Sequence, residues 1–389
     1  MQLLQISNTL CDISRLIRLA AAALLAVCPV VANAQQLAAP FAVAPQPDAV
    51  IGTPIPAGDC CGYWIVSTHS SPQSFDASCP PFCPRIMRYD ECGGHRNADY
   101  SEMMQSIQPG IPICIVVHGS FVGWEGACIE SRYTWKWLGS ACPGRPFQMI
   151  YFTWPSDREI TPLVQLDVAV LGRRASRNGY YLATLIQQLP PESPVCLVGH
   201  SHGTRVISSA LHMMAGGEID DVCHPCVRTT GRKIRAVYAA AAIDHDWLNP
   251  EERFGRALCT AECILNLKNS HDPALKIYPL RRPFSSRALG QAGFTSKDRR
   301  EMGGWGRRAA ELDVTNVIGH GHFWPEYFQR PGIARSIANY VFFPDYIVSY
   351  ENHPATQSPQ PAMTVPAVPG QLLIPQPSTA MSPISQVTR

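Results

Sequence analysis

The segment 195–211 constrains the fold of this chain more than any other. An apolar run at 195–198 is short enough to be a buried strand, and Gly-His-Ser-His-Gly follows it at 199–203. The next residues have the pattern of a helix, so the segment predicts a strand, a sharp turn and a helix, with the Ser201 hydroxyl exposed at the end of a sheet. Gly199 and Gly203 leave room where a Cβ would collide with neighbouring backbone. A tight turn around an ordinary serine has the same pattern, so the interpretation as a nucleophile requires a base and an acid elsewhere.

Composition favours one large domain rather than several small ones. Hydrophobic residues make up 46% and charged residues 16% of the 389 residues, which is enough apolar material for a sizeable core. The formal net charge is +2 and the arginines are scattered, without a basic stripe interleaved with aromatic residues. This distribution gives no indication of nucleic-acid binding.

The N-terminus has the pattern of an export signal. Arg15 and Arg18 precede an apolar run at 19–31, and Ala32-Asn33-Ala34 supplies small residues for a cleavage site. This predicts a signal peptide over residues 1–34, cleaved after Ala34. A permanent membrane anchor is the competing interpretation, but the run is short for a span, so we expect no stable membrane span in the mature chain.

Cysteine usage agrees with export to the periplasm, cell envelope or exterior. Two of the 15 cysteines lie before Ala34, and the thirteen that follow are many for a reducing compartment. The cysteines between 79 and 92 predict a loop closed by disulfides, because their spacing fits no zinc pattern well. Cys223 and Cys226 predict a local disulfide, because no second Cys pair follows at a zinc-site spacing.

The ordered domain is expected over residues 60–345. Residues 35–59 are rich in Pro and Ala and predict a flexible leader, and residues 346–389 are rich in Pro, Ser, Thr and Gln and predict a disordered tail. The oligomeric state is not indicated by the sequence.

Strand and helix patterns alternate along this domain. Strands are expected at 63–68, 113–121, 147–154, 195–200, 234–244, 263–272 and 314–318. Helices are expected within 128–142, at 162–189 with Asn178-Gly179 as a candidate interruption, after the 199–203 turn, and at 332–342. The segment 280–310 is rich in Arg, Gly and Ser and predicts a long loop. This alternation predicts an α/β fold with a mostly parallel central sheet and helices on both faces.

The order of three residue types supports the nucleophile interpretation. A serine hydroxyl needs a base within hydrogen-bond reach and a carboxylate that orients the base. Asp272 closes a predicted strand, and His322 follows the last one. The order Ser201, Asp272, His322 is the order that a strand, nucleophile elbow and helix architecture uses.

Five motifs together resemble the α/β-hydrolase superfamily, in particular an esterase/lipase-like branch. They lie at 116–119, 152–156, 199–203, 269–275 and 321–324. The resemblance implies a Ser-His-acid hydrolase without a metal or an organic cofactor. It also implies an oxyanion hole made by the backbone N–H of His202 and that of Ser120 or Phe121.

Two assignments stay open at this point. Asp244 is a rival acid because some lipase-like enzymes place the acid one strand earlier, and Asp246 is close to it in the chain. Asp272 is preferred because its turn and its neighbours match the superfamily. His320 is a rival base, and the Gly-His-Phe-Trp sequence around His322 favours the latter.

The expected function is an exported serine hydrolase that cleaves a small-molecule or lipid carboxylic ester through an acyl-enzyme on Ser201. One alternative is a protein of the cell envelope that has the hydrolase fold and binds or supports structure without turnover, since fold alone does not prove function. Another is an acyltransferase that uses the same three residues. The sequence does not indicate the substrate.

Overall fold

A computed structural model describes residues 62–74, 80–157, 164–224, 231–281 and 285–345, with only the backbone at 164–167. The predicted signal peptide, leader and tail lie outside these residues. So do Cys60, Cys61, Cys79 and Cys226, and the disulfides predicted with Cys79 and Cys226 are therefore not tested. The cysteines inside the described residues form no disulfide with one another.

Within the described residues, the main sheet has nine strands in the order β11-β10-β9-β6-β4-β5-β1-β2-β3. From β11 to β1 every neighbouring pair is parallel, and β2 and β3 continue the sheet as an antiparallel hairpin at one edge. The strands are β1 (Gly62–Ser67), β2 (Arg85–Asp90), β3 (Gly94–Ala98), β4 (Ile113–Val117), β5 (Gln148–Thr153), β6 (Val195–His200), β9 (Ile234–Ala239), β10 (Cys263–Lys268) and β11 (Ala309–Asp313). A small second sheet pairs β7 (Glu218–Ile219) with β8 (Val222–Cys223).

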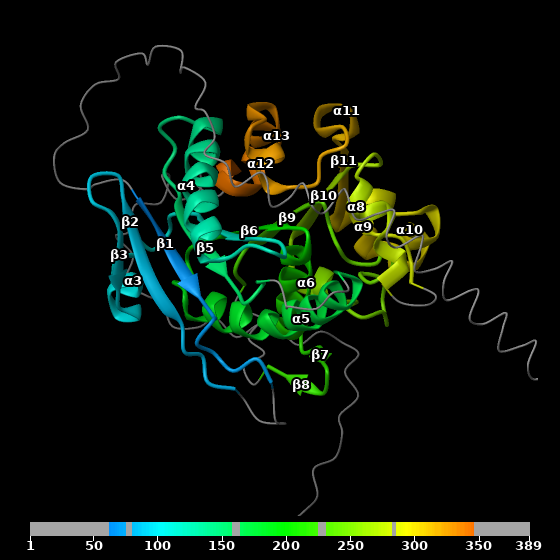
Figure 1. Ribbon diagram of the computed structural model, residues 1–389, viewed down its shortest axis with the longest axis horizontal. Helices are drawn as coiled ribbons and strands as arrows, with labels where there is room; N and C mark the ends of the chain where they lie inside the picture. The colour runs from blue at the N-terminus through cyan, green and yellow to red at the C-terminus, as the bar shows by residue number, and fades with distance from the viewer. Residues whose placement is uncertain (1–61, 75–79, 158–163, 225–230, 282–284, 346–389) are drawn as a thin grey trace, which may run out of the picture. The chain divides into compact units, whose positions relative to one another are not determined.

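Helices cover both faces of the main sheet (Figure 1). One face packs against α5 (Val164–Gln188) and α6 (His202–Met214), and the other against α4 (Trp124–Ala141), α12 (Trp324–Phe328) and α13 (Pro331–Phe342). The shorter helices are α3 (Tyr100–Ser106), α7 (Ala257–Thr260), α8 (Pro273–Lys276), η1 (Tyr278–Arg281), α9 (Leu289–Ala292), α10 (Ser296–Met302), η2 (Gly303–Arg308) and α11 (Thr315–Ile318). In the part of the chain that the structure describes, no helix has the length and apolar character needed to cross a membrane.

Alternation along the central strands explains this layering. Successive side chains of a strand point to opposite faces. In β6, Leu197 faces α5 and α6, whereas Cys196 and Val198 face α4 and α13. All three side chains are buried, as expected for a strand that is covered on both sides. The mostly parallel sheet with helices on both faces confirms the predicted α/β class, and β6 lies near the centre of the sheet.

The last strand differs from the prediction. Residues 314–318 form the helical turn α11, and the strand is β11, five residues earlier. The Asp313 side chain accepts a hydrogen bond from the Thr315 backbone N–H at 2.9 Å, which favours a turn over an extended chain. β11 lies at the sheet edge and is largely half-buried, so it lacks the continuous apolar run that marks the central strands.

The prediction of a long loop at 280–310 is also wrong. This segment contains α9, α10 and η2, and α10 begins with a capping box in which Thr295 and Asp298 bond each other's backbone N–H groups. Part of the predicted disulfide loop is the β2–β3 hairpin. Helix α5 runs without interruption through Asn178-Gly179.

Gly179 is required by the close packing of α5 against α6. A Cβ at this position would lie 2.5 Å from the Cβ and the Oγ of Ser209. Gly179→Val should therefore lower the free energy of unfolding by about 2 kcal/mol, as overpacked core positions do. Urea denaturation followed by circular dichroism measures this change. Gly332→Ala in α13 is the control, because its Cβ would meet no atom within 4 Å and its stability should not fall. Equal stability of the two variants would contradict the packing argument.

Candidate active site

Ser201 lies in a strained turn between β6 and α6. Its backbone angles are φ 50° and ψ −122°, a conformation that side chains other than glycine rarely adopt. The turn is fixed because the Ser201 N–H donates to Ala239 O at 2.9 Å and the Ser201 carbonyl accepts from Thr204 N at 3.1 Å. The flanking glycines are also required, since a Cβ at Gly203 would lie 2.2 Å from the Val117 carbonyl oxygen. This is the geometry of a nucleophile elbow.

The structure places Asp272 and His322 together, although they come from loops 50 residues apart. His322 Nδ1 lies 2.7 Å from Asp272 Oδ2, and Asp272 Oδ1 accepts from Leu275 N at 3.0 Å. The carboxylate is fully buried and caps α8. Asn269 joins the two loops by donating to the carbonyl oxygens of Gly319 and Gly321. Because Nδ1 donates to the carboxylate, Nε2 of His322 is the nitrogen that can accept a proton.

His322 lies beside the elbow. His200 Nε2 donates to the His322 carbonyl oxygen at 2.7 Å, and the two rings are 5.4 Å apart between centroids. Since His200 directly precedes Ser201, this contact brings the catalytic candidates to one place. Among the described residues, no hydrogen bond joins Ser201 Oγ to His322, a contact that often tightens when a substrate binds.

The rival acids and the rival base have other partners. Asp244 is buried and bonds the Tyr278 hydroxyl at 2.9 Å and the Arg281 guanidinium. Asp246 accepts from Ser286 Oγ at 2.8 Å. His320 is exposed, stacks on His271 and donates from Nδ1 to the His271 carbonyl oxygen at 3.3 Å. The geometry therefore favours Asp272 and His322.

The loop after β4 lies against the elbow. A Cβ at Gly119 would be 2.9 Å from the Ser201 Cβ, so only glycine allows this approach. The backbone N–H of Phe121 donates to the Ser156 carbonyl oxygen at 2.7 Å, which makes it unsuitable as an oxyanion donor. The backbone N–H groups of Ser120 and His202 are the better pair, and their side chains are joined by a 2.6 Å contact between Ser120 Oγ and His202 Nδ1.

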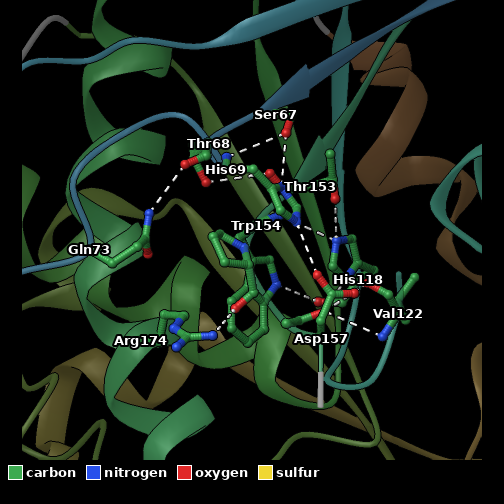
Figure 2. A network of polar contacts seen from close by, with 12 residues as sticks. Ser67, Thr68, His69, Gln73, His118, Val122, Thr153, Trp154, Asp157 and Arg174 are labelled. Atoms are coloured by element: carbon green, nitrogen blue, oxygen red, sulfur yellow. Dashed lines mark hydrogen bonds and ion pairs between the residues drawn. The ribbon is translucent and has the colours of Figure 1, made fainter. Parts of the chain in front are cut away.

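A polar network anchors this loop to the segment after β5 (Figure 2). His118 Nδ1 donates to Gly119 O at 2.8 Å, and its Nε2 accepts from Thr153 Oγ1 at 2.8 Å and from Trp154 N at 3.3 Å. The Trp154 indole N–H donates to His118 O, and the two rings stack. Burial lowers the pKa of His118 to about 4, so the ring is neutral and positions the loop as a hydrogen-bonding group.

The two histidines of the elbow are also neutral at physiological pH. Burial lowers the pKa of His200 to about 3, with the nearby His322 as a further cause. Burial, with Arg205 as the next cause, lowers the pKa of His202 to about 3 as well. Of the three histidines His200, His202 and His322, only His322 faces a carboxylate in the described residues. It is therefore the one suited to carry a positive charge during a reaction.

Sequence reasoning missed a buried arginine next to this site. Arg205 lies on α6 one turn after His202, and every residue of this helix is buried. A charged residue within a helix that directly follows the elbow is the signal that could have indicated it.

Among the described residues, no group of three or more His, Cys, Asp or Glu side chains could hold a metal ion.

The comparisons with known proteins find similarity at the level of structure. The sequence matches no protein-family model and no curated protein. A Trichoderma reesei cutinase solved with a C11Y4 phosphonate inhibitor is 13% identical, with a TM-score of 0.26 over 62% of this chain and 81% of the cutinase. An iodinated complex of acetyl xylan esterase is 12% identical, with a TM-score of 0.28 over 62% of this chain and 99% of the esterase.

The backbone strain at Ser201 can be measured without any substrate. Glycine adopts positive φ freely, whereas alanine does not. Ser201→Gly should therefore have a free energy of unfolding about 1 kcal/mol higher than that of Ser201→Ala, once the greater flexibility of unfolded glycine is included. Urea denaturation of the two variants compares them directly. An alanine variant as stable as the glycine variant would contradict a strained turn.

Proposed function

We propose that this protein is a serine hydrolase that cleaves a carboxylic ester through an acyl-enzyme on Ser201. The observation that carries the proposal is the 2.7 Å pair between His322 and Asp272, which lies beside a serine with a positive φ. A buried carboxylate that fixes a histidine next to an elbow serine is the arrangement that activates a hydroxyl at neutral pH.

The reaction would proceed in two halves. Ser201 Oγ attacks the ester carbonyl carbon while His322 Nε2 takes the hydroxyl proton, and the carbonyl π electrons move to oxygen. The C–O bond to the alcohol then breaks, and His322 returns the proton to the leaving oxygen. Water next attacks the acyl-enzyme with its proton passing to His322, and the carboxylic acid leaves as Ser201 regains its proton. Asp272 remains ionised throughout and stabilises the His322 cation.

The tetrahedral intermediates would be stabilised by two backbone N–H groups. His202 is the first residue of α6, so its N–H lies at the positive end of that helix. Ser120 supplies the second N–H from the loop after β4, and the His118 network fixes this loop before substrate arrives. Donors that are already oriented stabilise developing negative charge without further reorganisation.

Two measurements test this proposal: labelling by a fluorophosphonate probe and the rate of ester hydrolysis. The wild type should be labelled, and Ser201→Ala should abolish the label. His322→Gln and Asp272→Asn should lower kcat/KM for 4-nitrophenyl butyrate by about 10³-fold or more, as in other triads. His320→Gln and Asp246→Asn are matched controls that should change kcat/KM little, because their side chains have other partners. A folded wild type that takes no label and hydrolyses no ester would contradict the proposal and favour a binding or structural role.

The proposal includes export, which is supported by the N-terminal pattern and by the number of cysteines. A chain expressed with its first 34 residues in a secreting bacterial host should be recovered outside the cytoplasm with Gln35 as its first residue. N-terminal sequencing and intact mass measure this. Recovery from the cytoplasm with the N-terminus uncleaved would argue against export without affecting the proposed chemistry.

A further inference from the structure

Arg205 is a buried arginine that projects from the elbow helix. It is 7% exposed, and its Nε donates to Ser176 Oγ on α5 at 2.7 Å. Its guanidinium carbon lies 4.9 Å from the ring centroid of Trp247. The side chain is thus held by one hydroxyl and one aromatic ring, both of which are neutral.

Among the described residues, Arg205 has no carboxylate partner, and its terminal nitrogens donate to no acceptor. Two other buried or half-buried arginines have carboxylate partners: Arg235 bonds Glu262 at 2.8 Å and Asp345 at 2.9 Å, and Arg281 bonds Asp244. A buried charge without a partner is costly, so proteins rarely keep one without a ligand to balance it.

The charged groups around Arg205 are two further guanidinium groups and the carboxylate of Asp244, which is paired with Arg281. Three guanidinium groups, those of Arg205, Arg253 and Arg281, lie within 4.9, 5.5 and 5.6 Å of the Trp247 ring centroid. Burial lowers the pKa of Arg205 to about 9, the charges of Arg253 and Arg281 act in the same direction, and Tyr278 and Asp244 act in the opposite one. Negative oxygens of a ligand beside Arg205 would offset both the burial of its charge and the repulsion from Arg253 and Arg281.

Arg205 and His202 point to the same place. A Cβ on Gly172 of α5 would lie 2.6 Å from Arg205 Nη1 and 3.6 Å from His202 Nε2, so both nitrogens face this glycine. His202 Nε2 is buried and has no hydrogen-bond partner among the described residues. When Ser120 Oγ donates to His202 Nδ1, Nε2 of the neutral ring carries the proton. The unpaired N–H donors of Arg205 and His202 then lie close together, and His202 directly follows Ser201 in the chain.

We propose that Arg205 and His202 bind the negative oxygens of the substrate, so that the preferred ester carries a carboxylate in addition to the ester group. Arginine suits this role because its planar fork matches a carboxylate, and charged hydrogen bonds are strong when water is excluded. This inference rests on the proposed esterase function and names a class of substrate for it.

Two pairs of esters locate the carboxylate on the substrate. Mono-4-nitrophenyl glutarate and 4-nitrophenyl valerate differ in charge on the acyl side, and 4-acetoxybenzoate and phenyl acetate differ on the alcohol side. The wild type should favour the charged ester by about 10- to 100-fold in kcat/KM in one of the pairs. Arg205→Met should abolish this preference, and Arg205→Lys should retain part of it. A wild type without preference in either pair would overturn the inference.

Arg235→Met is the matched control, since it also removes a largely buried arginine, but one with carboxylate partners. It should lower stability and leave the charge preference unchanged. Arg205→Met should be at least as stable as the wild type, because an uncompensated buried charge is removed. If Arg205→Met nevertheless fails to fold, Arg205→Lys decides: a reduced charge preference supports the inference, and an unchanged one overturns it.

Binding to the inactive Ser201→Ala variant separates this inference from the proposed function. Monomethyl glutarate and 4-acetoxybenzoate are titrated by calorimetry, with methyl valerate and phenyl acetate as their neutral controls. At least one charged ester should bind, and the additional Arg205→Met substitution should weaken it about 10-fold or more. If the wild type hydrolyses no ester but this Arg205-dependent binding is seen, the esterase function fails while the anion site stands. Absence of Arg205-dependent binding overturns the site.

Discussion

The strained backbone of Ser201 is the constraint on which the rest of the site depends. A positive φ at this residue turns the chain sharply from β6 into α6, and two hydrogen bonds to Ala239 and Thr204 keep it there. The turn leaves no space for side chains at the neighbouring glycines, and it brings the loop after β4 against the serine. The same turn begins α6, so one local conformation positions the Ser201 hydroxyl, the proposed oxyanion donor His202 and the buried Arg205.

The proposed acid and base depend on a second constraint, which is long-range. Asp272 and His322 follow the neighbouring strands β10 and β11, and the ends of parallel strands meet at one edge of a sheet. Asn269 ties the two loops together, and His200 fixes the His322 backbone against the elbow. Because the histidine is oriented by a fully buried carboxylate, it does not depend on exposed side chains for its position.

The sequence predicted the central strands and the elbow because both are recorded locally, in continuous apolar runs and in the spacing of two glycines. It did not predict β11, because an edge strand that is half-exposed lacks such a run. It left Ser120 and Phe121 open as oxyanion donors, because the bond from Phe121 N to Ser156 O joins distant segments. Arg205 was missed for a related reason, since its lack of a carboxylate partner is visible only once α5 and η1 are packed around it.

The acyl-enzyme itself tests the central claim most directly. A 4-nitrophenyl ester is mixed with the protein, the reaction is quenched with acid within the first turnover, and the digested protein is analysed by mass spectrometry. The account predicts one peptide that is heavier by the mass of the acyl group minus one hydrogen, with the modification on Ser201. The acylated peptide should be more abundant in His322→Gln if that substitution slows deacylation more than acylation. Turnover that proceeds with no acyl group on Ser201, or with the acyl group on another residue, would contradict it.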